Sequence, residues 1–170
     1  MSNVGKWAPW YDRGAVVSYG DTASYAIAAE WLSGLAVEDW GCGCAEFRKH
    51  HDAEYWGVDG TAGWADEVDD LATRRSVTPA VMLRHVLEHN SDWRKVLRNA
   101  VASAKQRIVI VTFIPDGDGS QVGWTDELGV PDIAVPHDAV DKALRGWTFD
   151  RTTIESATAY GMETIWRAAR

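Results

Sequence analysis

The sequence predicts an α/β protein: a three-layer sandwich in which helices cover both faces of a mostly parallel sheet. Short apolar runs typical of buried strands alternate with amphipathic helical stretches, which is the pattern of parallel sheets. The last two apolar runs have no helix between them, so they should form an antiparallel hairpin at one edge of the sheet. Seven strands are expected in all.

The strands are recognised as short runs rich in β-branched and aromatic residues. They are expected at residues 35–40, 55–58, 80–83, 107–113, 147–154 and 162–168, with a vestigial third strand near Val68. Residues 61–76 are polar and acidic, which leaves room for that remnant and at most one short helix. Residues 114–136, after the fifth strand, are expected to form a loop.

Three helices have clear starts. Asp21 and Ser91 are good N-cap residues, and Pro136 suits the first turn of a helix. Gly34 and Gly146 end the first and the last of these helices. Their apolar faces are expected to carry Tyr25, Ala28, Ala29 and Leu32; Trp93, Val96, Leu97, Ala100, Val101 and Ala104; and Ala139, Val140, Ala143 and Leu144.

Length and composition fit one such domain. The 170 residues are 46% hydrophobic and 25% charged, as in a single soluble domain of ~100–200 residues. No apolar run reaches the ~18 residues of a membrane helix, and the first residues lack the apolar region of a signal peptide. We therefore expect a cytoplasmic protein with no membrane partner, made of an N-terminal arm (residues 1–20) and a single domain (residues 21–170).

Charge and cysteine content narrow the function classes. The formal net charge is −8, from 17 basic and 25 acidic residues, and a uniformly acidic surface repels the phosphates of a nucleic acid. Cys42 and Cys44 are too close for an easy disulfide and have no partners at zinc-site spacing. A small-molecule partner is expected and no metal. The oligomeric state stays open.

A glycine loop followed by an acidic residue is the most informative pattern. Residues 41–43 (GCG) lie between a strand and a short helix that runs through Phe47, where a ligand can approach the backbone and the helix N-terminus. Asp59 ends the next strand, 20 residues after Asp39, where a carboxylate can accept hydrogen bonds from both ribose hydroxyls. The pattern indicates a ligand that contains a nucleoside.

Dinucleotides and nucleoside triphosphates fit this loop poorly. The third glycine of a dinucleotide fingerprint would fall at Glu46, whose carboxylate would repel a pyrophosphate. No phosphate-binding loop with a Gly-Lys-Ser/Thr ending follows a strand.

Three segments together resemble the class I S-adenosylmethionine-dependent methyltransferases. Residues 37–43 (VEDWGCG) resemble the first motif of that superfamily, residues 55–60 (YWGVDG) its second, and residues 84–89 (RHVLEH) the segment after its fourth strand. The motifs occur in the family's order, and the C-terminal hairpin resembles the family's reversed last strands. The resemblance implies a Rossmann-like fold, S-adenosyl-L-methionine as cofactor and methyltransferase activity.

The resemblance also implies roles for particular residues. The methionine part of the cofactor would face Asp39, Gly41, Cys42 and Gly43; the ribose would face Asp59 and Gly60; the adenine would face Asp70 and Leu71, with Asp69 as an alternative acid; Arg84 and His85 would complete the cofactor site and line the methyl-transfer cleft. Two departures stand out: Ala45 replaces the family's third loop glycine, and the spacing after Asp59 leaves little room for the third strand and its helix.

Candidate catalytic and substrate residues lie beside this site. His85 is the first candidate for a general base and Glu88 the second, while Tyr19 and Arg84 are candidates for the substrate site. Tyr19 belongs to an aromatic arm with Trp7, Trp10 and Tyr11, which either lies over a ligand or only anchors the N-terminus. Two alternatives concern the histidines: a helix start that leaves Glu88 and His89 solvated, or a metal-binding pair of His85 and His89 on one helix face.

Three functional hypotheses follow. The first is methyl transfer from S-adenosyl-L-methionine to an acceptor, expected to be a small molecule. The second is a non-catalytic S-adenosyl-L-methionine-binding protein, because the shortened third-strand region is typical of a pared-down domain. The third is another nucleotide-dependent α/β enzyme such as a reductase, against which Glu46 argues.

Overall fold

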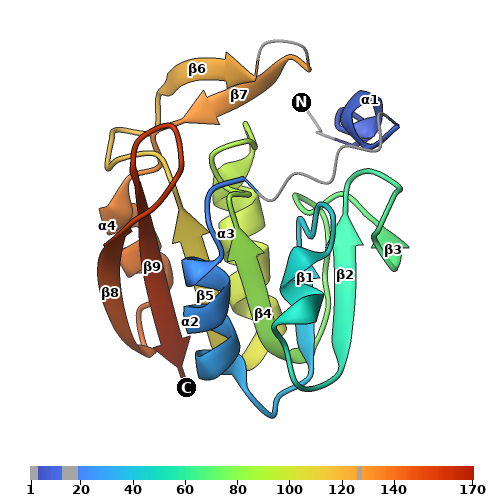
Figure 1. Ribbon diagram of the computed structural model, residues 1–170. Coiled ribbons are helices and arrows are strands. Elements are labelled where there is room, and N and C mark those ends of the chain that lie inside the picture. Colours follow the sequence, from blue (N-terminus) through green and yellow to red (C-terminus); the bar gives the residue numbers. More distant parts are fainter. Residues whose placement is uncertain (1–3, 13–18, 126–127) are drawn as a thin grey trace.

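Seven strands form one sheet in the order β3-β2-β1-β4-β5-β9-β8 (Figure 1). This computed structural model describes residues 4–12, 19–125 and 128–170. The strands of the sheet are β1 (Val37–Trp40), β2 (Tyr55–Asp59), β3 (Glu67–Val68), β4 (Thr78–Arg84), β5 (Ala104–Thr112), β8 (Thr148–Glu155) and β9 (Met162–Ala169). The expected seven-stranded α/β fold is confirmed.

The strand directions confirm a mostly parallel sheet with an antiparallel C-terminal hairpin. Strands β1 to β5 run parallel to one another, whereas β9 is antiparallel to both β5 and β8. At the centre of the sheet, Ile110 of β5 lies opposite Leu83 of β4 and Trp166 of β9. All three side chains are buried, so the middle of the sheet lies in the hydrophobic core.

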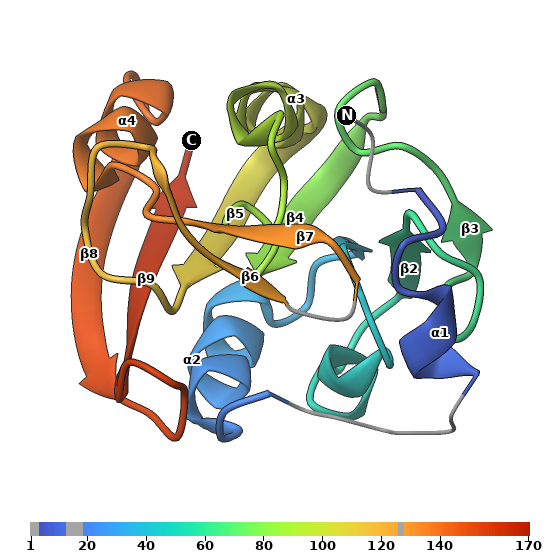
Figure 2. The same cartoon turned by 90° about the horizontal axis from the view of Figure 1, so that it is seen from above.

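Helices cover both faces of the sheet, which gives three layers (Figure 2). Helix α2 (Ala23–Leu32) lies on one face, and α3 (Trp93–Ser103) and α4 (His137–Ala143) lie on the other. Each face has its own hydrophobic cluster: Trp40, Trp93 and Trp166 belong to the α3–α4 side, and Tyr25, Phe47 and Met82 to the α2 side. None of the helices in the described residues has the length and apolar character needed to cross a membrane.

The connection between β2 and β4 is reduced, as its polar composition predicts. Strand β3 has only two residues, and residues 60–77 contain no helix. The buried Arg74 guanidinium forms ion pairs with Glu38, Glu67 and Asp69 at 3.2, 2.9 and 3.0 Å. Charge pairing therefore holds a segment that helix packing would hold in a full α/β unit.

Two parts of the chain path differ from the sequence prediction. A second sheet, the hairpin of β6 (Gln121–Thr125) and β7 (Val130–Ile133), occurs where only a loop was expected. Gly123 and Pro131 are atypical of strand interiors, which explains why the pattern does not reveal it. After the glycine loop, the expected short helix is the 3-10 helix η1 (Glu46–Lys49), which ends two residues beyond Phe47.

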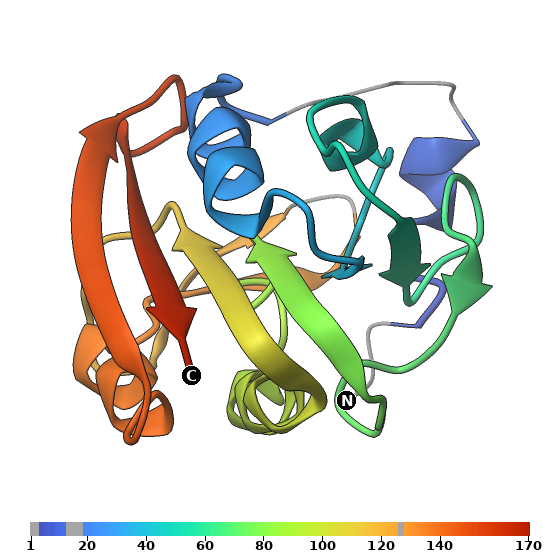
Figure 3. The ribbon, with the colours of Figure 1, turned by 90° about the horizontal axis from the view of Figure 1, so that it is seen from below.

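The described part of the N-terminal arm includes a short helix, α1 (Ala8–Tyr11), on the β2–β3 side of the molecule (Figure 3). The Gly5 N–H donates to the Gly60 carbonyl at 2.7 Å, and Lys6 Nζ donates to the Gly129 carbonyl at 3.2 Å. The arm thus connects the end of β2 to the β6–β7 hairpin. Residues 13–18 of the arm lie outside the described residues.

We expect the central packing of β5 to dominate stability. Replacing the fully buried Ile110 with alanine should lower the free energy of unfolding by about 2–5 kcal/mol, because the cavity left behind is enclosed by strands on both sides. Val77→Ala, at a side chain 77% exposed, should change it by less than about 0.5 kcal/mol. Urea denaturation followed by tryptophan fluorescence measures both, and equal losses would contradict this description of the core.

Candidate active site

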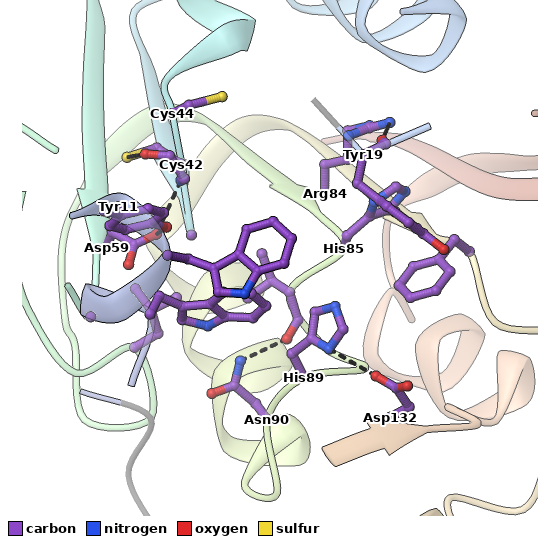
Figure 4. Close-up of a pocket in the computed structure, with 18 of the residues that line it drawn as sticks. Tyr11, Tyr19, Cys42, Cys44, Asp59, Arg84, His85, His89, Asn90 and Asp132 are labelled. Carbon is purple, nitrogen blue, oxygen red and sulfur yellow. Dashed lines mark hydrogen bonds and ion pairs between the residues drawn. The ribbon is translucent and has the colours of Figure 1, made fainter. Parts of the chain in front are cut away.

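A cavity of about 470 Å³ opens at the carboxyl ends of the parallel strands (Figure 4). This edge is where ligands bind in open α/β sheets. Of the residues predicted from the sequence, those that line the cavity are Tyr19, Gly41, Cys42, Gly43, Asp59, Gly60, Asp70, Leu71, Arg84 and His85. The alternative adenine acid Asp69 also lines it. Asp39 and Glu88 are not among the lining residues.

The glycine loop after β1 has a conformation that requires small residues. Gly41 has φ +76°, and a Cβ atom added there would lie 2.5 Å from Val86 Cγ2 in the loop after β4. Gly43 also has a positive φ, +54°. Ala45, which replaces the family's third loop glycine, also adopts a left-handed conformation, with φ +55°. This conformation is uncommon for a residue with a side chain. The loop therefore brings its backbone to the cavity wall.

Asp59, at the end of β2, is bonded to the glycine loop. Its Oδ2 accepts a hydrogen bond from the Gly43 N–H at 3.0 Å, and its Oδ1 accepts one from the Thr61 N–H at 2.9 Å. The Tyr11 hydroxyl of α1 donates to Oδ2 at 3.5 Å. Burial raises the pKa of Asp59 to about 6, although these donors act to lower it. A cation in the cavity would stabilise the ionised carboxylate.

Asp39 lies deeper in the protein than the sequence suggests. Its carboxylate, 4% exposed, accepts a hydrogen bond from the Tyr55 hydroxyl of β2 at 2.7 Å. Burial raises the pKa of Asp39 to about 7, while the bond to Tyr55 lowers it. The structure thus places this acid behind the glycine loop, where it ties β1 to β2.

The two candidate adenine acids have different partners. Asp69 accepts a hydrogen bond from Arg74 at 3.0 Å, as part of the charge cluster beside β3. Asp70 Oδ1 accepts one from the Ala72 N–H at 2.9 Å, so it caps the turn that presents Leu71. Leu71 is 93% buried and belongs to the core cluster of the α3–α4 side.

Arg84, at the end of β4, is held by several protein groups. Its Nε donates to Ser24 Oγ at 2.8 Å and its Nη1 to the Tyr25 hydroxyl at 3.1 Å, which fixes the start of α2 to the sheet. Nη2 donates to the Tyr19 carbonyl at 2.7 Å and pairs with Glu163 at 2.8 Å. Most of its donors are used inside the protein, so Arg84 shapes the cavity wall.

His85 is bound to a buried glutamate of β9. Its Nε2 lies 2.6 Å from Glu163 Oε1, and its backbone adopts φ +56°, which is uncommon outside glycine. Burial lowers the pKa of His85 to about 4, although Glu163 acts to raise it. Burial raises the pKa of Glu163, but the bond to His85 and the charge of Arg84 outweigh it and keep that pKa below its usual value. We therefore assign a neutral imidazole whose Nε2–H donates to the Glu163 carboxylate.

The segment after His85 is not the expected helix start. Residues 85–90 form bends and turns, and Glu88 is fully buried rather than solvated. Glu88 Oε1 accepts a hydrogen bond from the Phe113 N–H at 2.7 Å, and burial raises the pKa of Glu88 to about 7. His89 Nδ1 lies 3.2 Å from Asp132 of the β6–β7 hairpin. The two histidines therefore have different partners, and in the described residues no three potential metal ligands cluster.

Neither cysteine of the loop, Cys42 or Cys44, is in a disulfide bond. Burial raises the pKa of Cys42, and the carboxylates of Asp39 and Asp59 raise it further. Burial also raises the pKa of Cys44. Because the reactive form of cysteine is the thiolate, this environment disfavours nucleophilic catalysis by either residue.

Several lining residues were not singled out as site residues from the sequence. They are Val4, Tyr25, Cys44, Val86, Asn90, Phe113, Asp132, Ala159 and Tyr160. Phe113 directly follows β5, so the rule that ligands bind at the carboxyl ends of strands could have found it. Tyr160 and Asp132 come from the β8–β9 turn and the β6–β7 hairpin, which no local signal places near the glycine loop.

Comparison with known proteins defines the fold. The sequence matches no protein-family model and no curated protein. The structure is similar to 1,6-didemethyltoxoflavin-N1-methyltransferase from Burkholderia thailandensis, solved with 1,6-didemethyltoxoflavin and S-adenosylhomocysteine, with a TM-score of 0.69 and 13% identity over 96% of this chain and 85% of that chain. It is also similar to magnesium protoporphyrin IX methyltransferase from Synechocystis PCC 6803, solved with S-adenosylhomocysteine, with a TM-score of 0.59 and 18% identity over 97% of this chain and 84% of that chain.

A third similar structure has a different activity in its name. The [4+2]-cyclase SpnF has a TM-score of 0.67 and 12% identity over 97% of this chain and 92% of that chain. Structural similarity at sequence identities this low shows only that the fold is shared. The chain has the fold of the class I S-adenosylmethionine-dependent methyltransferases, and the resemblance drawn from its motifs is confirmed at that level.

We expect Gly41→Ala to be more harmful than an alanine at another left-handed glycine. Gly34 has nearly the same φ (+74°) but open space around it, so Gly34→Ala should cost only the backbone strain of about 1–2 kcal/mol. Gly41→Ala should cost about 1–3 kcal/mol more, because its Cβ overlaps Val86. Urea denaturation measures both, and adding Val86→Ala should recover part of the extra loss. Equal losses in the two single variants would argue against the contact.

The buried carboxyl group of Glu88 should make the stability of the protein depend on pH. Because the folded protein holds the Glu88 proton up to about pH 7 and the unfolded chain releases it near its ordinary pKa of ~4.3, the wild type loses stability as the pH rises through that window. Glu88→Gln removes this loss. The free energy of unfolding of the variant relative to wild type should therefore increase from pH 4.5 to pH 8, by on the order of 3 kcal/mol. Denaturation at the two pH values measures it, and a difference that stays constant with pH would contradict the assignment.

Proposed function

We propose that the protein binds S-adenosyl-L-methionine in this cavity and transfers its methyl group to a small-molecule acceptor. The observation that carries the proposal is the junction of Asp59 with the glycine loop. The carboxylate that ends β2 and the loop that follows β1 are joined by a 3.0 Å hydrogen bond on the wall of one cavity, at the carboxyl edge of the sheet. The fold and the cofactor products bound to two similar structures support this reading.

The residues on the cavity wall fit the parts of this cofactor. Gly41 and Gly43 bring the backbone to the cavity wall beside the methionine part, and Asp59 offers carboxylate oxygens to the ribose hydroxyls. Asp70 and Leu71 would meet the adenine beyond β2. The carboxylates of Asp59, Asp69 and Asp70 also suit a positively charged sulfonium, since opposite charges attract strongly in a partly desolvated site.

The catalytic task of the protein is mainly to position two molecules. The cofactor supplies an activated methyl group, because its sulfonium is a good leaving group. The chain would hold acceptor and methyl group in line and exclude water, which is where most of the rate enhancement arises. The arm, with Trp7 and Trp10 on the cavity wall, and the β6–β7 hairpin cover the site from above. His85 would orient the acceptor and take up its proton where one is released.

A non-catalytic cofactor-binding protein is the second candidate. Two observations favour it: the two-residue β3 without a following helix, and a similar structure named as a [4+2]-cyclase, which indicates that this fold serves more than methyl transfer. Incubation with methyl-labelled S-adenosyl-L-methionine and a broad metabolite extract distinguishes the two. Labelled product supports the methyltransferase, whereas tight binding without product supports the alternative.

We expect Asp59→Ala to weaken binding of S-adenosylhomocysteine by about 1–3 kcal/mol, because the variant lacks the charged hydrogen-bond acceptor for the ribose. Isothermal titration calorimetry measures the affinity. Asp118→Ala is a matched control, since Asp118 likewise accepts a backbone N–H, from Ser120, but lies outside the cavity. Circular dichroism of both variants checks that the fold is retained. Unchanged affinity in a folded Asp59→Ala variant would refute the ribose assignment.

A further inference from the structure

The cavity has two chemically different ends. One end is formed by residues after β2 and β3, such as Asp59 and Asp70, and the other by residues after β4 and β5 and from the β8–β9 turn. In the sheet order, β1 lies between these two groups of elements. Figure 4 shows the separation directly: Asp59 and Tyr11 lie at one side, and Tyr19, Arg84 and His85 at the other.

The end at β5 is built from aromatic rings that surround Phe113. The centroid of the Phe113 ring lies 4.8 Å from His85, 5.1 Å from Tyr19, 5.6 Å from His89 and 6.1 Å from Tyr160. All five side chains line the cavity. These distances are those of favourable aromatic pairs, so the rings form a continuous wall.

The wall is only partly covered by the protein itself. Phe113 is 4% exposed, but Tyr19 and Tyr160 are 40% and 42% exposed. Large apolar rings left open beside a cavity are typical of surfaces that bind another apolar or aromatic group. The wall also carries polar groups, but Arg84 is paired with Glu163, and His89 with Asp132.

One polar atom in this wall has a defined hydrogen-bonding state. Because the neutral imidazole of His85 donates its single N–H, at Nε2, to Glu163 at 2.6 Å, its Nδ1 carries a lone pair. Among the described residues, the hydrogen bond of the His85 ring is made through Nε2, and none involves Nδ1. The imidazole thus offers a hydrogen-bond acceptor at the aromatic end of the cavity.

We propose that the methyl acceptor is a planar aromatic or heteroaromatic molecule that packs against Phe113, Tyr19 and Tyr160 and directs a hydroxyl or ring N–H to His85 Nδ1. This inference rests on the proposed methyltransferase function. The acceptor oxygen or nitrogen forms a bond to the methyl carbon, the carbon–sulfur bond breaks, and its electron pair stays on sulfur. The acceptor proton passes to Nδ1 and from there to water. Glu163 is a positioning residue, because it acts through His85.

The weak basicity of His85 favours this class of acceptor over an aliphatic alcohol. An imidazole whose pKa is about 4 is unprotonated at neutral pH, so it can accept a proton, but it is a weak base. A phenolic hydroxyl has a pKa of ~10, as in tyrosine, whereas water has ~15.7. A proton on an aromatic hydroxyl is therefore far easier for this residue to take as the methyl group is transferred.

The test uses matched aromatic and saturated fragments on protein saturated with S-adenosylhomocysteine. The probes are 2-naphthol and decahydro-2-naphthol, which share a carbon skeleton and a hydroxyl, and their affinities are measured by saturation-transfer NMR titration. We expect 2-naphthol to bind at least fivefold more tightly. A smaller ratio, or no binding of either probe, would overturn the proposal.

Substitutions in the aromatic wall test where the two fragments bind. Tyr160→Leu should reduce the affinity ratio at least threefold, whereas Tyr160→Phe should preserve it, since the ring remains. Trp124→Leu, at an exposed tryptophan of β6 outside the cavity, is the control and should leave the ratio unchanged. If neither Tyr160→Leu nor Phe113→Leu reduces the ratio, the fragments bind elsewhere and the proposal is wrong.

A second pair of probes tests the hydrogen bond between the ligand hydroxyl and His85 Nδ1. In wild type, 2-naphthol should bind at least threefold more tightly than 2-methylnaphthalene, which has a methyl group in place of the hydroxyl. His85→Phe should remove this preference while retaining the aromatic wall, and a preference that persists would overturn the role of Nδ1.

Calorimetry with S-adenosylhomocysteine on the same samples separates the two levels of the argument. If the compound does not bind, the proposed function is wrong and the acceptor proposal falls with it. If it binds but the aromatic preference is absent, only the acceptor proposal falls.

Discussion

The hydrogen bonds of Asp59 are the interactions on which the site depends. One carboxylate receives backbone N–H groups from the loop after β1 and from the turn after β2, so two neighbouring strand ends are locked at one point of the cavity. Burial would ordinarily penalise this charge, and the donors offset part of that penalty. The same oxygens face the arm through Tyr11. The core of the sheet fixes where the strands end, and this carboxylate fixes how the loops between them present their backbone.

Much of the fold follows from local pattern. Buried runs such as β5 and amphipathic stretches such as α3 alternate plainly enough to define the parallel sheet, and the missing helix between the last two strands indicates the reversed hairpin. The β6–β7 hairpin does not follow, because Gly123 and Pro131 lack strand propensity and the hairpin depends on contacts such as that of His89 with Pro131. The short 3-10 helix after the glycine loop is likewise a tertiary result, since Phe47 packs with the α2 face.

The candidate site divides in the same way. Gly41, Gly43 and Asp59 could be found because they follow or end strands at known spacing in the chain. Glu163 could not, because it meets His85 across 78 positions of sequence and only the sheet order places β9 beside β5. The resemblance implies that Asp39 faces the cofactor, and Glu88 is a candidate base, yet both side chains are buried and neither lines the cavity. Sequence spacing identifies the strand end but not the direction in which a side chain points.

The position of β9 has a consequence for how this protein is made. β9 follows every other strand in the chain, yet it lies between β5 and β8, and it supplies Glu163 together with the buried Ile165 and Trp166. Until the ribosome has released residues 162–169, β5 has an unpaired apolar edge and the cavity lacks the partner of His85. A nascent or truncated chain that stops before Met162 thus exposes the unpaired apolar edge of β5. We expect such a chain to associate with other copies and to require chaperones.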